Sequence, residues 1–194
     1  MALIFAVLTL LFASQEAKEG TAGDAQKTVK IKRIVVEGTR LPALSVIHLA
    51  QIRAGDEVNF LKLHSALQKV TQSGLIKSID FEYESAPDSE TDVIVHLKCV
   101  DEKPSATATI QIPKVNEGDV WMWLEQIDPL FTREMPPTDA AIRLYAAWIG
   151  KYMESHGEPN FQENFAVIAD AASSTGSMVP DRLIFKVTKR RGRK

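Results

Sequence analysis

The sequence has 194 residues, of which 45% are hydrophobic and 25% are charged, as in ordinary globular proteins. This length allows one large domain or two small ones. The net charge is −2, yet five of the last six residues are basic, so the rest of the chain is clearly acidic. An acidic body disfavours nucleic acid, which is bound mainly through its phosphates. We predict that the basic tail, 189–194, is a solvated end; a contact with phosphates or an anionic membrane is the alternative.

Residues 2–13 form an apolar run, ALIFAVLTLLFA, and small and polar residues follow it over 15–27. A membrane-spanning helix needs about 20 apolar residues, so the run is short for an anchor. It is typical of the core of a secretory signal peptide over 1–14, although no Lys or Arg precedes it. We therefore predict export, with 15–27 as a linker. An ordinary buried helix or strand is the alternative, and an uncut run would act as an anchor.

The sequence contains no recognisable catalytic or metal-binding motif. Cys99 is the single cysteine, and its strand, VIVHLKCV, places it beside apolar residues as a small buried hydrophobe. The four histidines are His48, His64, His96 and His156. No two of them have the spacing of metal ligands on a helix. We predict a protein that is not an enzyme, with no catalytic residue, no cofactor and no metal.

Residues 28–104 predict the element order strand, helix, helix, strand, strand. The first strand ends at Gly38, and a short helix then stops near Gly55. Asn59 is a suitable N-cap for the second helix, and Gly74 is expected to end that helix in the left-handed conformation. The next strand alternates apolar and acidic residues, which predicts one face against the helices and one face in water. The residues facing the helices are Ile79, Phe81 and Tyr83, and those facing water are Asp80, Glu82 and Glu84.

Residues 105–188 repeat this order with a strand (ATATIQIP), a helix after Gly118, a longer helix from Thr138 to Gly157, and two strands. This is the pattern of a tandem repeat of one α+β module. Trp121 and Trp123 lie two residues apart on the predicted helix, so they point in different directions. Two arrangements are equally favoured. In one, a single ring is exposed as a contact surface; in the other, both rings are covered between the two units.

The motifs of the first unit resemble those of a POTRA domain, the polypeptide-transport-associated module of outer-membrane assembly and secretion proteins. The similar segments are IKRIVVEG, IRAGDEVN, SGLIKSIDFEYE and VDEKP; in the second unit, RLYAAWIGKYMESHG is similar to the long helix of such modules. The resemblance implies tandem β-α-α-β-β modules, each a three-stranded mixed sheet with two helices on one face. It also places the closing strand between the other two.

With the closing strand central, the strand over Ile79–Glu84 has a free edge that can pair with an extended chain. We therefore predict a non-enzymatic periplasmic scaffold, associated with the outer membrane, that binds extended segments of outer-membrane or envelope assembly proteins by β-augmentation. A cell-division or cell-wall POTRA module that organises partners from a membrane anchor is the alternative. A small-ligand enzyme that uses a cleft between the units is a third hypothesis.

Overall fold

The computed structural model describes residues 28–89, 91–156, 160–173 and 179–190. The predicted signal peptide, the linker over 15–27, Gly157 and the end of the basic tail lie outside these residues.

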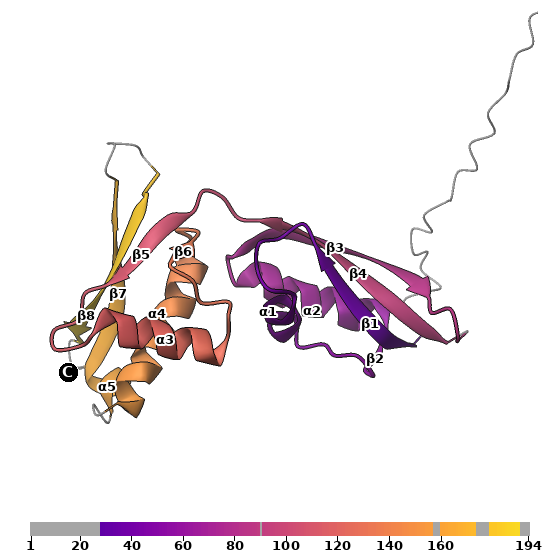
Figure 1. Cartoon of the computed structure of the whole chain (residues 1–194), viewed down its shortest axis with the longest axis horizontal. Coiled ribbons are helices and arrows are strands. Elements are labelled where there is room, and N and C mark those ends of the chain that lie inside the picture. Colours follow the sequence, from indigo (N-terminus) through magenta and orange to yellow (C-terminus); the bar gives the residue numbers. More distant parts are fainter. Residues whose placement is uncertain (1–27, 90, 157–159, 174–178, 191–194) are drawn as a thin grey trace, which may run out of the picture.

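Two successive groups of elements make up the described chain (Figure 1). The first contains β1 (Val29–Glu37), α1 (Ala43–Ala50), β2 (Glu57–Val58), α2 (Phe60–Gln72), β3 (Ile76–Ser85) and β4 (Asp92–Asp101). The second contains β5 (Ala106–Ile110), α3 (Glu117–Ile127), β6 (Glu134–Met135), α4 (Asp139–Ser155), α5 (Phe161–Asn164), β7 (Phe165–Ala172) and β8 (Arg182–Lys189). The mixed α+β fold class is as predicted.

Each group forms a mixed sheet, with the order β2-β1-β4-β3 in the first and β6-β5-β8-β7 in the second. The closing strands β4 and β8 are central, because each pairs in parallel with the first strand and antiparallel with the third. Each sheet was predicted to have three strands but has four, because the two-residue strands β2 and β6 pair with β1 and β5 at the edge of each sheet. Two residues are too few to produce a visible alternation in the sequence.

The helices of each group cover one face of its sheet (Figure 1). In the first group, alternate residues of β4 meet the helices because side chains alternate along a strand; the buried ones are Val93, Val95, Leu97 and Cys99. On α2, Leu63, Leu67 and Val70 complete this core at helical spacing. In the second group the largest fully buried side chains are Trp121, Tyr145, Phe131 and Phe185.

Three helices begin at the side-chain caps that their sequences favour. Asn59 accepts a hydrogen bond from the Lys62 N–H (2.8 Å), and Thr138 accepts one from the Ala141 N–H (3.2 Å). Asn116 caps α3 in the same way, through the Gly118 N–H. Gly118 is therefore inside α3, whereas the sequence pattern predicted that the helix begins after it.

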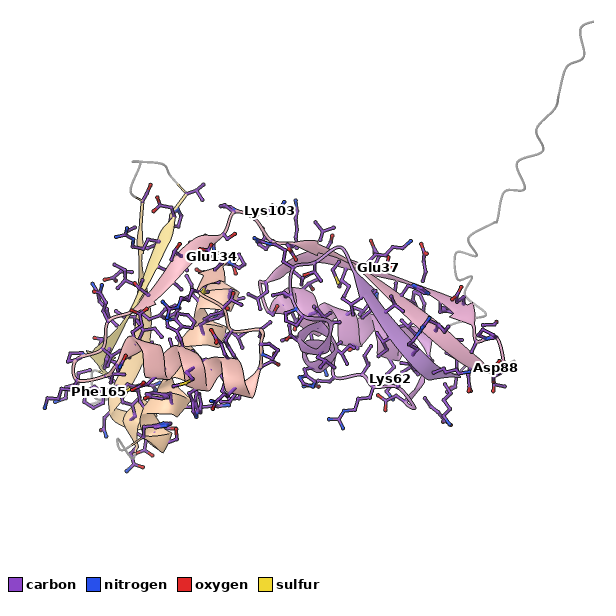
Figure 2. All side chains as sticks on the ribbon, in the orientation of Figure 1. Glu37, Lys62, Asp88, Lys103, Glu134 and Phe165 are labelled. Atoms are coloured by element: carbon purple, nitrogen blue, oxygen red, sulfur yellow. The ribbon has the colours of Figure 1, made fainter. Side chains whose placement is uncertain are left out.

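The two groups lie side by side and meet through several specific contacts. Lys103 is in the segment between them, and Asp88 is at the far end of the first group (Figure 2). The Ser45 hydroxyl donates a hydrogen bond to the Asp128 carboxylate, and Leu75 is buried in the core of the second group. The prediction that 28–104 and 105–188 are separate folding units stays a prediction.

Candidate functional site

The strand β3 is the outer strand of the first sheet, and in the described chain it pairs with β4 alone. The Ala86 N–H donates to the Asp92 carbonyl (2.8 Å), one step beyond the pair Ser85–Val93. In an antiparallel ladder, hydrogen-bonded pairs alternate with non-bonded pairs. The even-numbered residues from Asp80 to Glu84 therefore bond to β4. The N–H and C=O groups of the odd-numbered residues point to the open side; these are Ile79, Phe81, Tyr83 and Ser85.

The side chains of these odd-numbered residues face the helices to different extents. Ile79 and Phe81 are half-buried against the first core, as the alternation predicts. Tyr83 is 49% exposed, so the prediction that it packs against the helices was wrong. The physical reason is the length of the strand. The Phe60 ring at the start of α2 already meets Phe81 (5.6 Å between centroids), and Tyr83 lies one repeat further along β3.

An apolar pocket of about 130 Å³ opens beside this part of β3, between the sheet and the start of α2. Phe60, Phe81 and Tyr83 give it an aromatic wall, and Leu63, Val93 and Val95 are among its apolar lining residues. Phe60 is 41% exposed and also stacks on the His64 ring (6.2 Å). The site therefore combines the open backbone edge of β3 with this pocket, and the face of β3 that borders the pocket is its groove side.

The other face of β3 presents Asp80, Glu82 and Glu84 to solvent, as predicted. Glu82 forms an ion pair with Lys98 of β4, and Glu84 lies 3.5 Å from the His96 Nε2. Both carboxylates are more than 60% exposed, so these contacts contribute little to stability. Asp80 forms no ion pair with any described residue. Charges on an edge strand discourage pairing with a second copy of the same strand while the backbone stays accessible.

The second sheet has a corresponding edge that the sequence analysis did not single out. The strand β7 pairs with β8, and the Arg190 N–H donates to the Asn164 carbonyl (2.8 Å), in step with the pair Phe165–Lys189. The same alternation therefore directs the backbone groups of the odd-numbered β7 residues outward. The single carboxylate of this strand, Asp170, is paired with Lys186 (2.9 Å). The signal that could have identified it is the place of FAVIADAA in the repeated element order, where it corresponds to β3.

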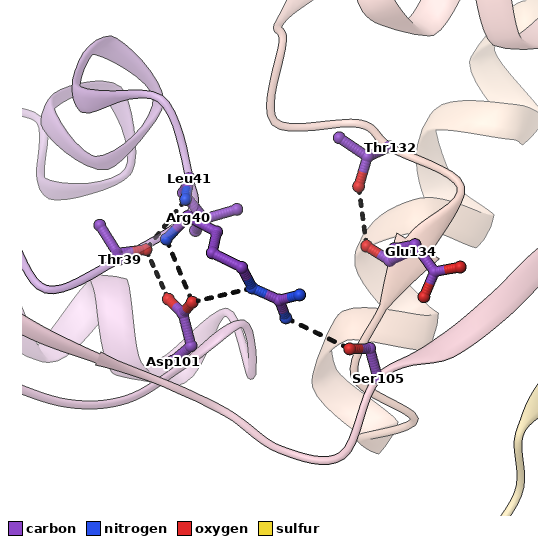
Figure 3. A network of polar contacts seen from close by, with 7 residues as sticks. All are labelled: Thr39, Arg40, Leu41, Asp101, Ser105, Thr132 and Glu134. Atoms are coloured by element: carbon purple, nitrogen blue, oxygen red, sulfur yellow. Dashed lines mark hydrogen bonds and ion pairs between the residues drawn. The ribbon is translucent and has the colours of Figure 1, made fainter.

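The polar network between the groups is centred on Asp101 (Figure 3). Its carboxylate accepts hydrogen bonds from the Thr39 hydroxyl, the Arg40 backbone N–H (3.1 Å) and the Arg40 side chain (3.3 Å). Arg40 also donates to the Ser105 hydroxyl (3.2 Å). Burial alone would raise the pKa of Asp101, but these hydrogen bonds and the Arg40 charge outweigh it and lower the pKa.

Among the glycines predicted at the ends of strands and helices, Gly74 has the left-handed backbone that the sequence predicts, and Gly38 and Gly55 also have positive φ. Gly38, Gly55 and Gly74 have φ values of 78°, 95° and 72°, while Gly157 is outside the described residues. At Gly38 a Cβ atom would lie 2.3 Å from the Cys99 carbonyl oxygen, so a side chain is excluded there for a second reason. These residues shape the turns around the site and contribute no side chain to it.

The two tryptophans do not form an exposed pair. Trp121 is 1% exposed and its Nε1–H donates to Glu117 (3.0 Å), so it is a buried ring and not the exposed contact aromatic. Its ring is in the core of the second group, where it meets Tyr145 of α4 (6.3 Å between centroids). Trp123 is half-buried against Trp148 and Tyr152 of α4, with centroid distances of 6.3 and 5.6 Å. It packs within the second group and not between the groups; its role as a contact stays a prediction.

The described residues contain no group of three His, Cys, Asp or Glu side chains placed to hold a metal ion. The four histidines have different surroundings: His48 is near Asp128, His64 on Phe60, His96 near Glu84 and His156 on Tyr152. Within the same residues, none of the helices has the length and apolar character needed to cross a membrane.

No family model matches the chain, and no curated protein matches it significantly. Among solved structures it is similar to the N-terminal domain of Omp85 from the cyanobacterium Thermosynechococcus elongatus, with 16% identity and a TM-score of 0.39. It is also similar to POTRA1-3 of Omp85 from Anabaena (13%, 0.38) and to POTRA3-5 of BamA from Haemophilus influenzae (14%, 0.34).

These likenesses cover 82%, 82% and 86% of this chain, which spans 62%, 61% and 67% of the respective structures. The solved structures to which the chain is similar therefore include POTRA domains, the module that its sequence motifs also resemble.

Proposed function

We propose that the protein is a non-enzymatic scaffold that binds extended polypeptide segments by adding them as a strand to the edge of β3. The observation that carries this proposal is the open edge over Ile79–Ser85 beside the pocket at Phe60. Main-chain hydrogen bonds supply affinity in this mode, and pockets for alternate side chains supply selectivity. Both parts are present on one side of the first sheet.

The partners that fit this site are unfolded or extended segments of outer-membrane proteins and of envelope assembly proteins. Recognition through the main chain tolerates many sequences, which suits a protein that handles many clients in assembly or secretion. The apolar run over 2–13 supports export to the periplasm, and the POTRA-like motifs support a place near the outer membrane.

The test uses proline, which removes one N–H donor and places its ring where an incoming strand would pair. Tyr83→Pro is on the open side of β3, so it keeps the ladder to β4 and we expect it to abolish peptide binding. Tyr83→Ala loses the same side chain but keeps the N–H, so it should weaken binding only a few-fold. Glu82→Pro removes a bond to β4, and we expect it to lower the melting temperature.

The probe is a labelled peptide of about ten residues with alternating apolar and polar positions, the length of one strand of a membrane barrel. Its affinity is measured by fluorescence anisotropy, and folding is checked by circular dichroism. Ala171→Pro, at an exposed and open position of β7, is the matched edge control and should leave binding unchanged. Equal binding by folded Tyr83→Pro and Tyr83→Ala proteins would overturn the proposal.

A further inference from the structure

We propose that the segment added to β3 has two distinct faces, with basic side chains on the outer face of the sheet and apolar or aromatic side chains on the groove side. This inference rests on the proposed function, because it concerns the chemistry of the client at the same edge. It follows from the side chains that border the edge.

The geometry of a sheet fixes which side chains meet. An added strand lies about 4.8 Å from β3, and its side chains alternate in step with those of β3. Directly opposed residues then bring their Cβ atoms to within about 5.5 Å of each other. Every second residue of the client is therefore next to the row Asp80, Glu82 and Glu84, and the residues between them are next to Phe81 and Tyr83.

The row on the outer face carries more negative charge than its neighbours neutralise. From the β4 side, Lys98 forms an ion pair with Glu82, and the half-buried His96 ring lies beside Glu84. Asp80 has no ion-pair partner among the described residues. Of the other basic residues on these strands, Lys77 precedes Asp80 by three residues on β3, and Arg33 of β1 lies across β4 from Glu84. Neither forms an ion pair with a described residue. Arg33 is two strand spacings from β3, about one Debye length at physiological salt, so screening reduces its effect at the edge.

Opposite charges on directly opposed strand positions favour pairing, and like charges oppose it. A lysine or arginine in the client can reach a carboxylate of this row from the open side, where none of the described strands pairs with β3. An aspartate or glutamate at the same position would face a like charge. The edge therefore favours basic residues at alternate client positions.

The groove side sets the other half of the pattern. Phe60 and Tyr83 are both exposed enough to receive a neighbour, and the pocket between them has an aromatic wall. A large apolar side chain opposite Tyr83 would cover these rings and remove apolar surface from water. The second edge lacks this combination, since β7 carries one carboxylate, already paired with Lys186.

Three peptides with identical apolar positions test the inference; their remaining positions are all Lys, all Gln or all Glu. Each opposed ion pair is worth roughly a two- to fivefold change in affinity. We expect the Lys peptide to bind the native protein about tenfold more tightly than the Glu peptide, with Gln between them. Because exposed charges are screened, the difference should shrink at high salt.

The charge-reversed protein Asp80→Lys/Glu84→Lys should reverse the order of the three peptides. Asp170→Lys, a matched change at the edge of the second sheet, should leave the order as in the native protein. If the three peptides bind equally and Tyr83→Pro abolishes all of that binding, the proposed function stands and this inference is wrong. If none of them binds, or if Tyr83→Pro changes nothing, the proposed function and this inference both fall.

Discussion

The Thr138 hydroxyl donates a hydrogen bond of 2.9 Å to the Gly74 carbonyl, and this bond joins the start of α4 to the turn between α2 and β3. The same hydroxyl accepts the N-cap bond from Ala141. Gly74 has the positive φ that the sequence predicts for a left-handed helix end. The second role of this turn, as a contact with the other group of elements, is visible only in the structure.

A side chain at Gly74 should destabilise the protein in two ways. The left-handed backbone costs an L-residue about 1–2 kcal/mol. In addition, a Cβ atom there would be 2.3 Å from the Thr138 Oγ1 and 2.9 Å from the Ala140 Cβ. We expect Gly74→Ala to lower the free energy of unfolding by about 2–4 kcal/mol, measured by denaturant titration.

A double-mutant cycle separates the two causes. Thr138→Ala removes the clashing oxygen along with its cap, at about 1 kcal/mol. Gly74→Ala should then cost less in the Thr138→Ala protein than in the native protein, with a coupling of about 0.5–3 kcal/mol. Strict additivity of the two changes would show that the clash with Thr138 does not matter.

Leu75 is next in the chain and gives a test of the two-unit organisation. It follows the helix α2 of the first group but is 4% exposed, in the core of the second. In the whole chain, Leu75→Ala should therefore lower the free energy of unfolding by about 2–5 kcal/mol.

In a fragment of residues 28–104, Leu75 has lost those neighbours, so Leu75→Ala should change the stability by less than about 0.5 kcal/mol. Leu67→Ala is the matched control, because Leu67 is buried in the first core and should matter equally in both proteins. A fragment that unfolds without cooperativity would contradict the prediction that 28–104 is a separate folding unit.

The parts of the fold that were predicted correctly depend on local signals. The alternation in β3, the Asn59 cap and the left-handed helix end at Gly74 each need only a few neighbouring residues. The central place of β4 followed from the resemblance of the motifs to those of POTRA domains. Each of these signals survives in the sequence because local preference and final structure agree.

The parts that were missed depend on distant contacts. Nothing near Ser45 in the sequence indicates that it bonds to Asp128, 83 residues away. The exposure of Tyr83 depends on where α2 begins, and the burial of Trp121 depends on how α3 lies over its sheet. Alternation identified the two faces of β3, but the backbone groups that point to the open edge required the register with β4.

Asp101 predicts how the first group responds to acid. Because its pKa is lower in the folded state than in the unfolded state, ionised Asp101 stabilises the fold above its unfolded pKa, near 3.9. This contribution is lost as the pH falls through the lower, folded pKa. At neutral pH, Asp101→Asn should cost about 1–3 kcal/mol, since hydrogen bonds to a charged acceptor are lost.

The difference between native and Asp101→Asn proteins should narrow as the pH is lowered below about 4, in unfolding titrations at each pH. Thr39→Val removes one donor to the carboxylate and should reproduce part of the effect. A difference that is constant from neutral pH to pH 3 would mean that the charge of Asp101 does not contribute.

The buried thiol of Cys99 predicts the opposite response, at alkaline pH. Burial, and secondarily the negative charge of Asp101, raise its pKa to about 11. A raised thiol pKa means that the neutral form is favoured in the folded state. The stabilisation of the fold by the neutral thiol is complete below the unfolded pKa, near 8.5, and is lost as the pH rises through about 11.

Cys99→Ala isolates this contribution, because every other group titrates equally in both proteins. At neutral pH the variant should be less stable by about 1–2 kcal/mol, since it loses a buried sulfur. Between pH 8 and 11 the native protein should lose about 2–3 kcal/mol more stability than the variant, so the difference should vanish or change sign. Unfolding curves that stay parallel over this range would show that the Cys99 thiol is not held in its neutral form by the fold.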